Sequence, residues 1–314
     1  MMITRFTAWQ GEEAVLLSGG GYEAIILPGW GANCVSLRYL PSGAELLRTP
    51  PDLQALRANP NVYGLPLLFP PNRIRDGSYA FNGTEYRFPI NEPARHHHIH
   101  GFLSSTPFEW LGGADFSYRA NEENPYLSFP HAFSIKRSFM LDEGGLSQTL
   151  FVENNSRRDM PLGIGFHAAW NVPPIQGDSA GDYRLRIPVK TQWLYEPDTI
   201  IPTGESLNDS PLIQSLREGS LVTEGQAVSC LLECRPGPIS LSGPGGTLVC
   251  ERDERFRFVM LWNGDGRQNF VCPEPQSWMV DAPNLPLPPE TTGFEALQPG
   301  ERRVYRLRYY FEQA

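Results

Sequence analysis

The sequence predicts an all-β protein, an antiparallel sandwich or barrel with one or two short helices. Short β-rich runs recur at regular spacing along the chain and are separated by turn residues, a pattern typical of such folds. The 30 glycines and 30 prolines among the 314 residues supply those turns and would interrupt long helices. Apolar residues make up 40% of the chain, enough to fill a sizeable core.

The first third of the chain contains three predicted strands, a helix and a hairpin. The helix is expected within residues 50–60, where Asp52 precedes the apolar positions and Pro60 would end it. A tight turn is expected at Asn82-Gly83, because aromatic residues alternate on both sides of this pair. The strands are predicted at residues 13–17, 22–27 and 34–39.

The rest of the chain continues as short strands. Two alternating runs, 131–141 and 146–154, flank a turn and predict a meander. No repeat of fixed period and no break in composition marks a boundary, so we expect a single domain over residues 1–314. The remaining expected elements are an apolar run at 161–172, strands at 183–189 and 193–195, a loop at 198–205, a short helix within 207–220, and strands at 256–262 and 302–311.

Charge and composition exclude several classes of partner. The net charge is −9 and the pI is about 5.2, which disfavours binding to nucleic acid or to an anionic membrane surface. No secretory segment and no membrane-spanning apolar run is found, so a soluble cytoplasmic protein is expected. The five cysteines are scattered, which indicates reduced structural thiols: Cys34, Cys230, Cys234, Cys250 and Cys272.

Four of the six histidines lie within five positions, at His96, His97, His98 and His100. Imidazole exchanges protons near neutral pH, so the cluster suggests catalysis or sugar binding. Two other interpretations remain open. In an extended segment His96, His98 and His100 would share one face and could bind zinc, copper or nickel. The run could also be an exposed loop.

Several short motifs follow one another in a defined order. They are Asn72-Arg73-Ile74, Phe81-Asn82-Gly83-Thr84-Glu85-Tyr86, His98-Ile99-His100-Gly101, Val152-Glu153-Asn154, Gly165-Phe166-His167, Pro273-Glu274-Pro275-Gln276, Asp281-Ala282-Pro283-Asn284 and the run from Leu297 to Glu301. This ordered set, spread over residues 15–312, resembles the aldose 1-epimerase (galactose mutarotase) family. The resemblance implies a large antiparallel β-sandwich, the galactose mutarotase-like supersandwich, with a sugar cleft on one sheet.

The resemblance also implies a reaction, the interconversion of the α and β anomers of a free aldose without metal or cofactor. By position, Glu274 would be the base that takes the proton of the C1 hydroxyl, and His167 the acid that protonates the ring oxygen. His100 and Arg73 would bind the sugar, with His98 as a secondary candidate. The only partner implied is a small-molecule sugar, and the protein would be a monomer or homodimer.

The residue types suit this chemistry. Mutarotation needs one proton removed and one delivered, which a carboxylate and an imidazole can do together. An apolar pocket would raise the pKa of Glu274, and Trp170 and Trp278 could wall that pocket or equally belong to the core. By themselves Glu274 could be a loop carboxylate, His167 a core histidine, and Arg73 a partner of Asp76.

One departure from the family concerns the substrate. The family's sugar-binding aspartate has no counterpart in residues 225–233, and Asp265 or Asp281 would have to replace it in space. This departure puts a preference for galactose in doubt. Three alternatives to the proposed class of enzyme also stay open. They are a hexose 6-phosphate epimerase that uses Arg73, Arg75 and Arg95, a non-catalytic carbohydrate-binding sandwich, and a metal-dependent enzyme that uses His96, His98 and His100.

Overall fold

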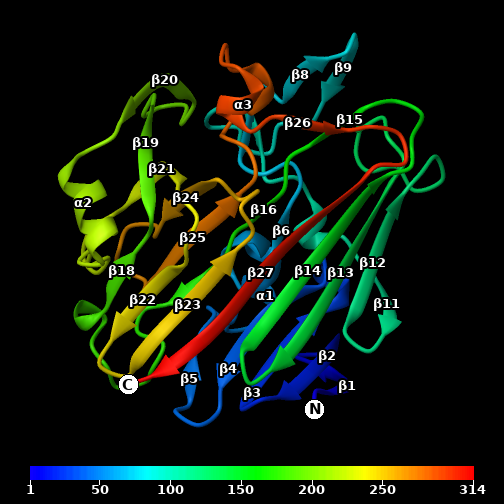
Figure 1. Ribbon diagram of the computed structural model, residues 1–314. Coiled ribbons are helices and arrows are strands. Elements are labelled where there is room, and N and C mark those ends of the chain that lie inside the picture. Colours follow the sequence, from blue (N-terminus) through cyan, green and yellow to red (C-terminus); the bar gives the residue numbers. More distant parts are fainter.

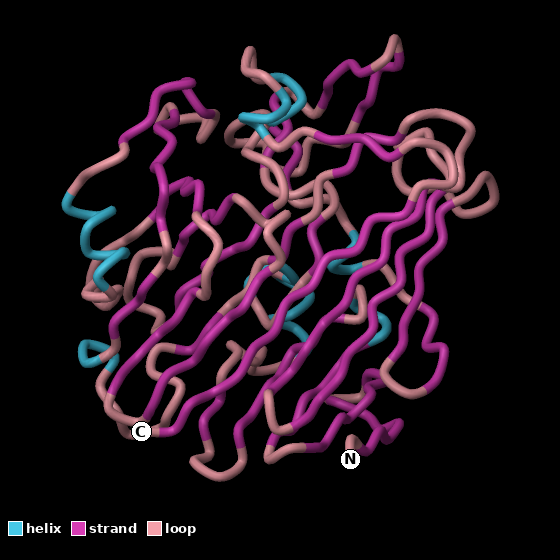
Figure 2. Tube along the Cα trace, in the orientation of Figure 1, coloured by secondary structure: helices cyan, strands magenta, loops and turns pink.

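The computed structural model describes all 314 residues and confirms the all-β class (Figures 1 and 2). Two sheets of eight strands and one of five dominate the structure, and the strand pairs that build them are antiparallel. One continuous cluster of buried apolar side chains, including Val15, Leu150 and Leu261, draws on all three sheets, which therefore share a core.

We name the sheets by their place in the structure. The N-terminal sheet contains β1 (Ile3–Trp9), β2 (Glu12–Gly19), β3 (Tyr22–Leu27), β4 (Asn33–Tyr39) and β5 (Ala44–Glu45). The long-strand sheet has the order β11 (Glu109–Gly112), β12 (Asp115–Ala120), β13 (Phe133–Asp142), β14 (Gly145–Asn154), β27 (Arg302–Gln313), β23 (Gly246–Arg252), β22 (Ile239–Gly243) and β18 (Arg184–Arg186).

The third sheet carries the candidate site, and we call it the cleft sheet. Its order is β20 (Pro202–Leu207), β19 (Val189–Tyr195), β21 (Ser229–Cys234), β24 (Phe258–Trp262), β25 (Phe270–Gln276), β16 (Gly165–Phe166) and β6 (Leu67–Leu68), with β17 (Trp170–Asn171) also paired to β25. Three small pairs complete the strands: β7 (Arg73–Arg75) with β10 (His97–Ile99), β8 (Ser78–Phe81) with β9 (Thr84–Arg87), and β15 (Met160–Leu162) with β26 (Glu295–Leu297).

Helices are few and short. The α-helices are α1 (Leu53–Ala58), α2 (Pro211–Glu218) and α3 (Pro289–Thr292), and 3-10 turns span Pro28–Trp30, Pro60–Val62, Leu103–Ser105, Ala180–Asp182 and Ala282–Asn284. In α1 the Asp52 side chain accepts the Ala55 amide at 2.7 Å. In α2 Ser210 caps the start, and Gly219 ends the helix in the left-handed conformation. None of these helices has the length and apolar character that a membrane crossing requires.

Local patterns explain most elements. In β13 and β14 buried and less buried residues alternate, since one face of the long-strand sheet covers the core (Figure 1). The β8–β9 hairpin turns at Asn82 and Gly83, both with positive φ, as predicted. The expected loop at 198–205 is wrong in part, because β20 begins at Pro202. Its mostly exposed residues pair only with β19 at the sheet edge and so lack an alternating pattern.

Candidate active site

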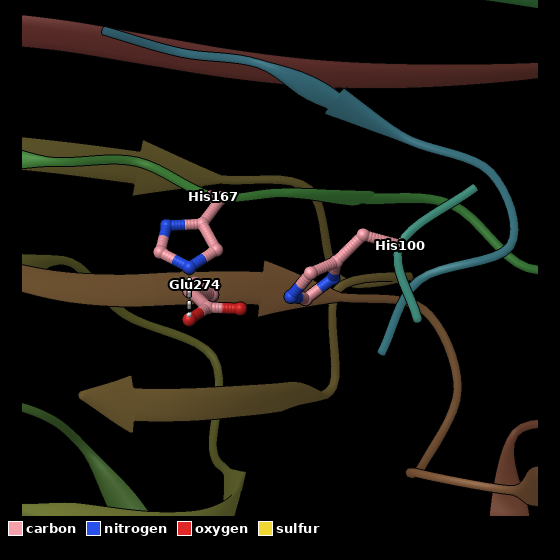
Figure 3. Close-up of side chains that lie close together, drawn as sticks. All are labelled: His100, His167 and Glu274. Carbon is pink, nitrogen blue, oxygen red and sulfur yellow. Dashed lines mark ion pairs between the residues drawn. The ribbon is translucent and has the colours of Figure 1, made fainter. Parts of the chain in front are cut away.

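A cleft of about 680 Å³ opens beside the cleft sheet and collects the charged residues of several distant segments. Glu274 from β25 and His167, which follows β16, line it together with His100, which follows β10. Figure 3 shows the three side chains pointing toward one another. Nε2 of His167 lies 3.1 Å from Oε1 of Glu274, and the His100 and His167 rings meet edge to face at 5.3 Å between centroids.

The backbone around Glu274 explains how His167 comes to face it. Along β25 the amide of Ser277 donates to the carbonyl of Ile164, and the carbonyl of Asn269 accepts the amide of Val172. The backbone N–H and C=O groups of odd-numbered residues therefore point toward β16 and β17. Pro273 and Pro275 lie on that side and carry no N–H, so neither can donate a hydrogen bond to the chain between β16 and β17. The register is the same on both sides of this unpaired stretch, Gly165 with Gln276 and Trp170 with Val271, and it places His167 opposite Glu274.

The segment between β16 and β17 is held from its other side. The amide of His167 bonds to the carbonyl of Pro66 at 3.1 Å, and the amide of Ala169 bonds to that of Gly64 at 3.0 Å. His167 therefore stands beside Glu274 with its backbone anchored on residues 64–66. Two prolines that look like loop residues in the sequence in fact lie within a central strand and remove two hydrogen-bond donors from one of its edges.

His100 is held in one orientation and one tautomer. Its backbone has a φ of 65°, and the next residue must be glycine, because a Cβ on Gly101 would overlap the carbonyl oxygen of Phe69. Its Nδ1 accepts the amide of Asn72 at 3.3 Å. The proton of the neutral ring therefore resides on Nε2, which makes His100 a hydrogen-bond donor to the cleft.

Burial sets the protonation of the central pair. Glu274 is 2% exposed and His167 5% exposed. Burial raises the pKa of Glu274 to about 8, against smaller lowering effects of the Gln276 amide and the Arg73 guanidinium. Burial lowers the pKa of His167 to about 4 and that of His100 well below its usual value. Near neutral pH the one proton of the Glu274–His167 pair therefore resides on Glu274, and the His167 imidazole is neutral.

Gln276 fixes the other oxygen of the carboxylate. Its side-chain amide donates to Oε2 of Glu274 at 3.1 Å, and the residue is fully buried two positions along the same strand. Since alternate residues of a strand face the same side, this contact is built into β25. Glu274 thus has one oxygen on Gln276 and the other directed at His167.

Arg73 lies on the cleft, as expected, but its partner is Glu92 rather than Asp76. The guanidinium grips the Glu92 carboxylate with two bonds of 2.7 and 2.8 Å, and Arg95 adds a third at 3.0 Å. Burial by itself would raise the pKa of Glu92, but these two cations hold it below its usual value. Two cations and one carboxylate thus form one rim of the cleft.

Three predicted binding residues lie outside the cleft lining. His98 is buried, stacks on Phe88 and bonds through Nδ1 to the carbonyl of Pro89 at 2.8 Å. Trp170 and Trp278 are 0% and 1% exposed and belong to the core. Trp170 packs edge-on against Tyr309 of the long-strand sheet. Trp278 stacks on Phe294.

The histidine run does not form the metal set considered from the sequence. His96 is exposed and binds Asp76, whereas His98 packs on Phe88 and only His100 reaches the cleft. The group with metal-like spacing is instead His100, His167 and Glu274, whose potential ligand atoms lie within 4.8 Å of one another.

The hydrogen bonds of that group suit proton transfer better than metal binding. His100 accepts a hydrogen bond at Nδ1 and so presents Nε2–H, which has no lone pair for a metal. Nδ1 of His167 makes no hydrogen bond, whereas metal-bound histidines almost always donate their second N–H. The donor set therefore does not fit a resident metal.

The sequence did not single out three residues that line the cleft. Trp262, at the end of β24, stands edge-on to His167 with ring centroids 5.6 Å apart. Tyr195 donates to the carbonyl and hydroxyl oxygens of Ser229, at 2.6 and 3.0 Å. Ser229 begins β21, in the stretch where the family's aspartate was expected, so the hydroxyls of Tyr195 and Ser229, both neutral, occupy this place.

Neither Asp265 nor Asp281 lines the cleft, so neither replaces the family's aspartate there. Asp281 is fully buried and binds Arg75.

For the sugar substrate that the family resemblance implies, we expect Trp262→Ala to raise KM about tenfold, a loss of about 1.4 kcal/mol of binding, with a smaller effect on kcat. The reason is that the indole provides an apolar wall beside His167, against which the face of such a substrate would pack. Steady-state kinetics check this. Trp110→Ala, which removes an exposed indole stacked on Phe6, is the matched control and should leave KM unchanged. Equal KM values for both variants would contradict a role for Trp262.

Fold and site together define a class: an antiparallel β-sandwich protein with a buried glutamate–histidine pair in a cleft on one sheet. A model of the aldose 1-epimerase family matches residues 13–310, so the chain belongs to that family. Family membership supports an epimerase, an isomerase-type enzyme, with a sugar as substrate.

Individual relatives agree with this placement. A galactose mutarotase-like protein from Clostridium acetobutylicum has a TM-score of 0.93 and 29% identity, over 100% of this chain and 99% of that one. Galactose 1-epimerase from Lactobacillus acidophilus shares the fold, with a TM-score of 0.71 and 14% identity over 100% and 99% of the two chains. The uncharacterized protein YihR of Escherichia coli K12 is 27% identical over 159 residues. That match spans about half the length of each chain, 49% of both.

Proposed function

We propose that this protein interconverts the α and β anomers of a free aldose, with Glu274 as the base and His167 as the acid. The observation that carries the proposal is the buried contact of 3.1 Å between the Glu274 carboxylate and the His167 imidazole in an open cleft. Near neutral pH the proton of the pair resides on Glu274, so the proposed roles require its transfer across this contact to Nε2 of His167. That transfer leaves a carboxylate that can accept a proton and an imidazolium that can donate one, as the reaction requires.

The reaction needs only proton transfers. Glu274 removes the proton of the C1 hydroxyl while His167 gives one to the ring oxygen, so the C1–O5 bond breaks and an open-chain aldehyde forms. Rotation about C1–C2 presents the other face of the carbonyl. The protons then return along the same path and the ring closes to the other anomer, which leaves the protein unchanged. The sugar would enter between two groups that contact each other in its absence.

The neighbouring groups would hold the sugar and its developing charge. His100 offers a neutral Nε2–H to a sugar oxygen, and Arg73 provides a fixed cation on the cleft rim. Gln276 keeps the Glu274 carboxylate from rotating. Burial of the pair keeps water away from the proton transfers and strengthens these interactions.

The pH dependence of kcat/KM should be bell-shaped. Above about pH 8 the pair loses its only proton, so the acid is lost; below about pH 4 it takes up a second, so the base is lost. Rates corrected for spontaneous mutarotation, over a range that spans both limbs, check this, with circular dichroism to confirm folding. A rate that increases monotonically across that range would contradict the assignment.

The direct test uses the wild-type protein and pure α-glucose, α-galactose and glucose 6-phosphate. We expect optical rotation to decay faster than the spontaneous rate with a free aldose. Preference for glucose 6-phosphate would favour the phosphate alternative, which the structure supports less, because Arg73 and Arg95 both bind Glu92 and Arg75 binds Asp281. Sugar binding by calorimetry without any acceleration would instead indicate a non-catalytic sandwich and end the proposal.

A further inference from the structure

A cation lies in the core without an anionic partner. Arg137, on β13 of the long-strand sheet, is 0% exposed. Its guanidinium donates to the carbonyls of Gly31 at 2.7 Å and Leu65 at 3.1 Å and to the side-chain oxygen of Gln148, and no carboxylate contacts it. Burial lowers its pKa to about 9, so it remains charged at neutral pH.

Burying a charged side chain carries a large desolvation free energy, and an apolar side chain of similar volume would fill the site without it. A buried charge bound to three oxygens from separate segments does offer geometric precision, since the planar guanidinium sets several directions at once. Arg137 joins three separate segments in this way, at Gly31, Leu65 and Gln148.

Two of its contacts lead directly to His167. Leu65, whose carbonyl it binds, is flanked by Gly64 and Pro66, the residues that accept the amides of Ala169 and His167. The guanidinium carbon also lies 5.5 Å from the centre of the Phe166 ring, on the residue before His167. In the register of β25 with β16 and β17, His167 lies opposite Glu274 and its amide bonds to Pro66 on the other side, so residues 64–66 are its backbone support.

The other hydrogen bonds of Leu65 do not involve its carbonyl, which is the group that Arg137 binds. The amide of Leu65 donates to Cys34 and to the side chain of Asn33, at 3.1 and 2.8 Å. These bonds hold the amide of Leu65, whereas its carbonyl is held by Arg137. Removing the guanidinium would free the carbonyl of Leu65 beside Pro66 without touching the cleft lining.

We propose that Arg137 is a positioning residue, which sets the acid His167 against Glu274 through the Leu65–Pro66 peptide and Phe166. The effect on activity rests on the proposed function, whereas the effect on the backbone does not. A displacement of the acid by about 1 Å is enough to slow a proton transfer up to about 10²-fold. The sugar contacts themselves stay in place, so KM should change little.

The experiment compares Arg137→Met and Arg137→Lys with wild type. We expect kcat to fall about 10- to 100-fold in Arg137→Met, with KM within about threefold. Lysine keeps the charge but not the fork that reaches two carbonyls, so it should restore kcat only in part. Hydrogen exchange should show the amides of His167 and Ala169 exchanging faster in both variants, while the Ser277 amide, bonded to Ile164, is unaffected.

Arg252→Met is the matched control. Arg252 also binds two backbone carbonyls, those of Phe256 and Arg235, and has no link to residues 64–66. We expect it to lose stability but keep kcat within about twofold. The proposal is overturned if Arg137→Met and Arg252→Met change kcat alike, if the two amides keep their protection, or if neither Arg137 variant folds. If the wild-type protein has no epimerase activity, the proposed function is refuted. The hydrogen-exchange rates of the His167 and Ala169 amides would still show whether Arg137 holds the backbone of this segment.

Discussion

Glu274→Gln is expected to lower kcat for anomer exchange by about 10³-fold. Glutamine keeps the shape and the neighbour of the carboxylate, since Gln276 and His167 can still contact it. An amide oxygen cannot take up the proton of the C1 hydroxyl, so ring opening loses its base. Polarimetry with a pure anomer, corrected for the spontaneous rate, measures the loss, and sugar affinity by calorimetry should change little.

Glu233→Gln is the matched control for this variant. Glu233 is also a buried carboxylate on the cleft sheet, but it binds Lys190 and Arg257 and does not line the cleft. Its kcat should stay within about twofold of wild type. A Glu274→Gln protein that retains a tenth or more of the wild-type kcat, roughly, would rule out Glu274 as the base.

His167→Asn is expected to lower kcat by about 10²- to 10³-fold, because the ring oxygen would then leave without a proton donor. The amide keeps a polar group in the site but does not titrate. The acid limb of the pH profile, assigned to the second proton on the pair, should therefore change as well as the rate. The measurement is kcat/KM of His167→Asn and of wild type across the same pH range.

His131→Asn tests whether any buried histidine would behave this way. His131 is 5% exposed, as His167 is, and burial lowers its pKa to about 4 as well. It bonds to Tyr86 and Ser156, both at 2.8 Å, and lies outside the cleft. We expect reduced stability and an unchanged pH profile. Similar profiles for the two variants would mean that His167 is not the acid.

Much of the fold follows from local pattern. The β8–β9 hairpin depends on Asn82 and Gly83, both of which adopt positive φ, and α1 depends on Asp52 as its cap. The β13–β14 meander depends on alternation along one covered face. Where residues lack such a pattern the prediction failed: β20 is polar and exposed, so only its pairing with β19 makes it a strand.

The candidate site was predictable in part. Residue type and motif order led to Glu274, His167, His100 and Arg73, all of which line the cleft. The sequence did not identify which tryptophan lines the cleft. Trp170 and Trp278 lie in the core and Trp262 on the cleft, although all three occur in apolar runs. Which face of a strand meets the cleft depends on partner strands far away in sequence.

The sequence by itself determined the strand-rich class, because glycine, proline and alternating apolar residues act within a few positions of one another. It also supplied the chemical groups that an acid–base reaction needs. Only the tertiary structure decided that His167 meets Glu274, that Arg73 takes Glu92 as its partner, and that Pro273 and Pro275 lie within a central strand. Those outcomes depend on sheet register and on contacts between remote segments, and no local pattern encodes either.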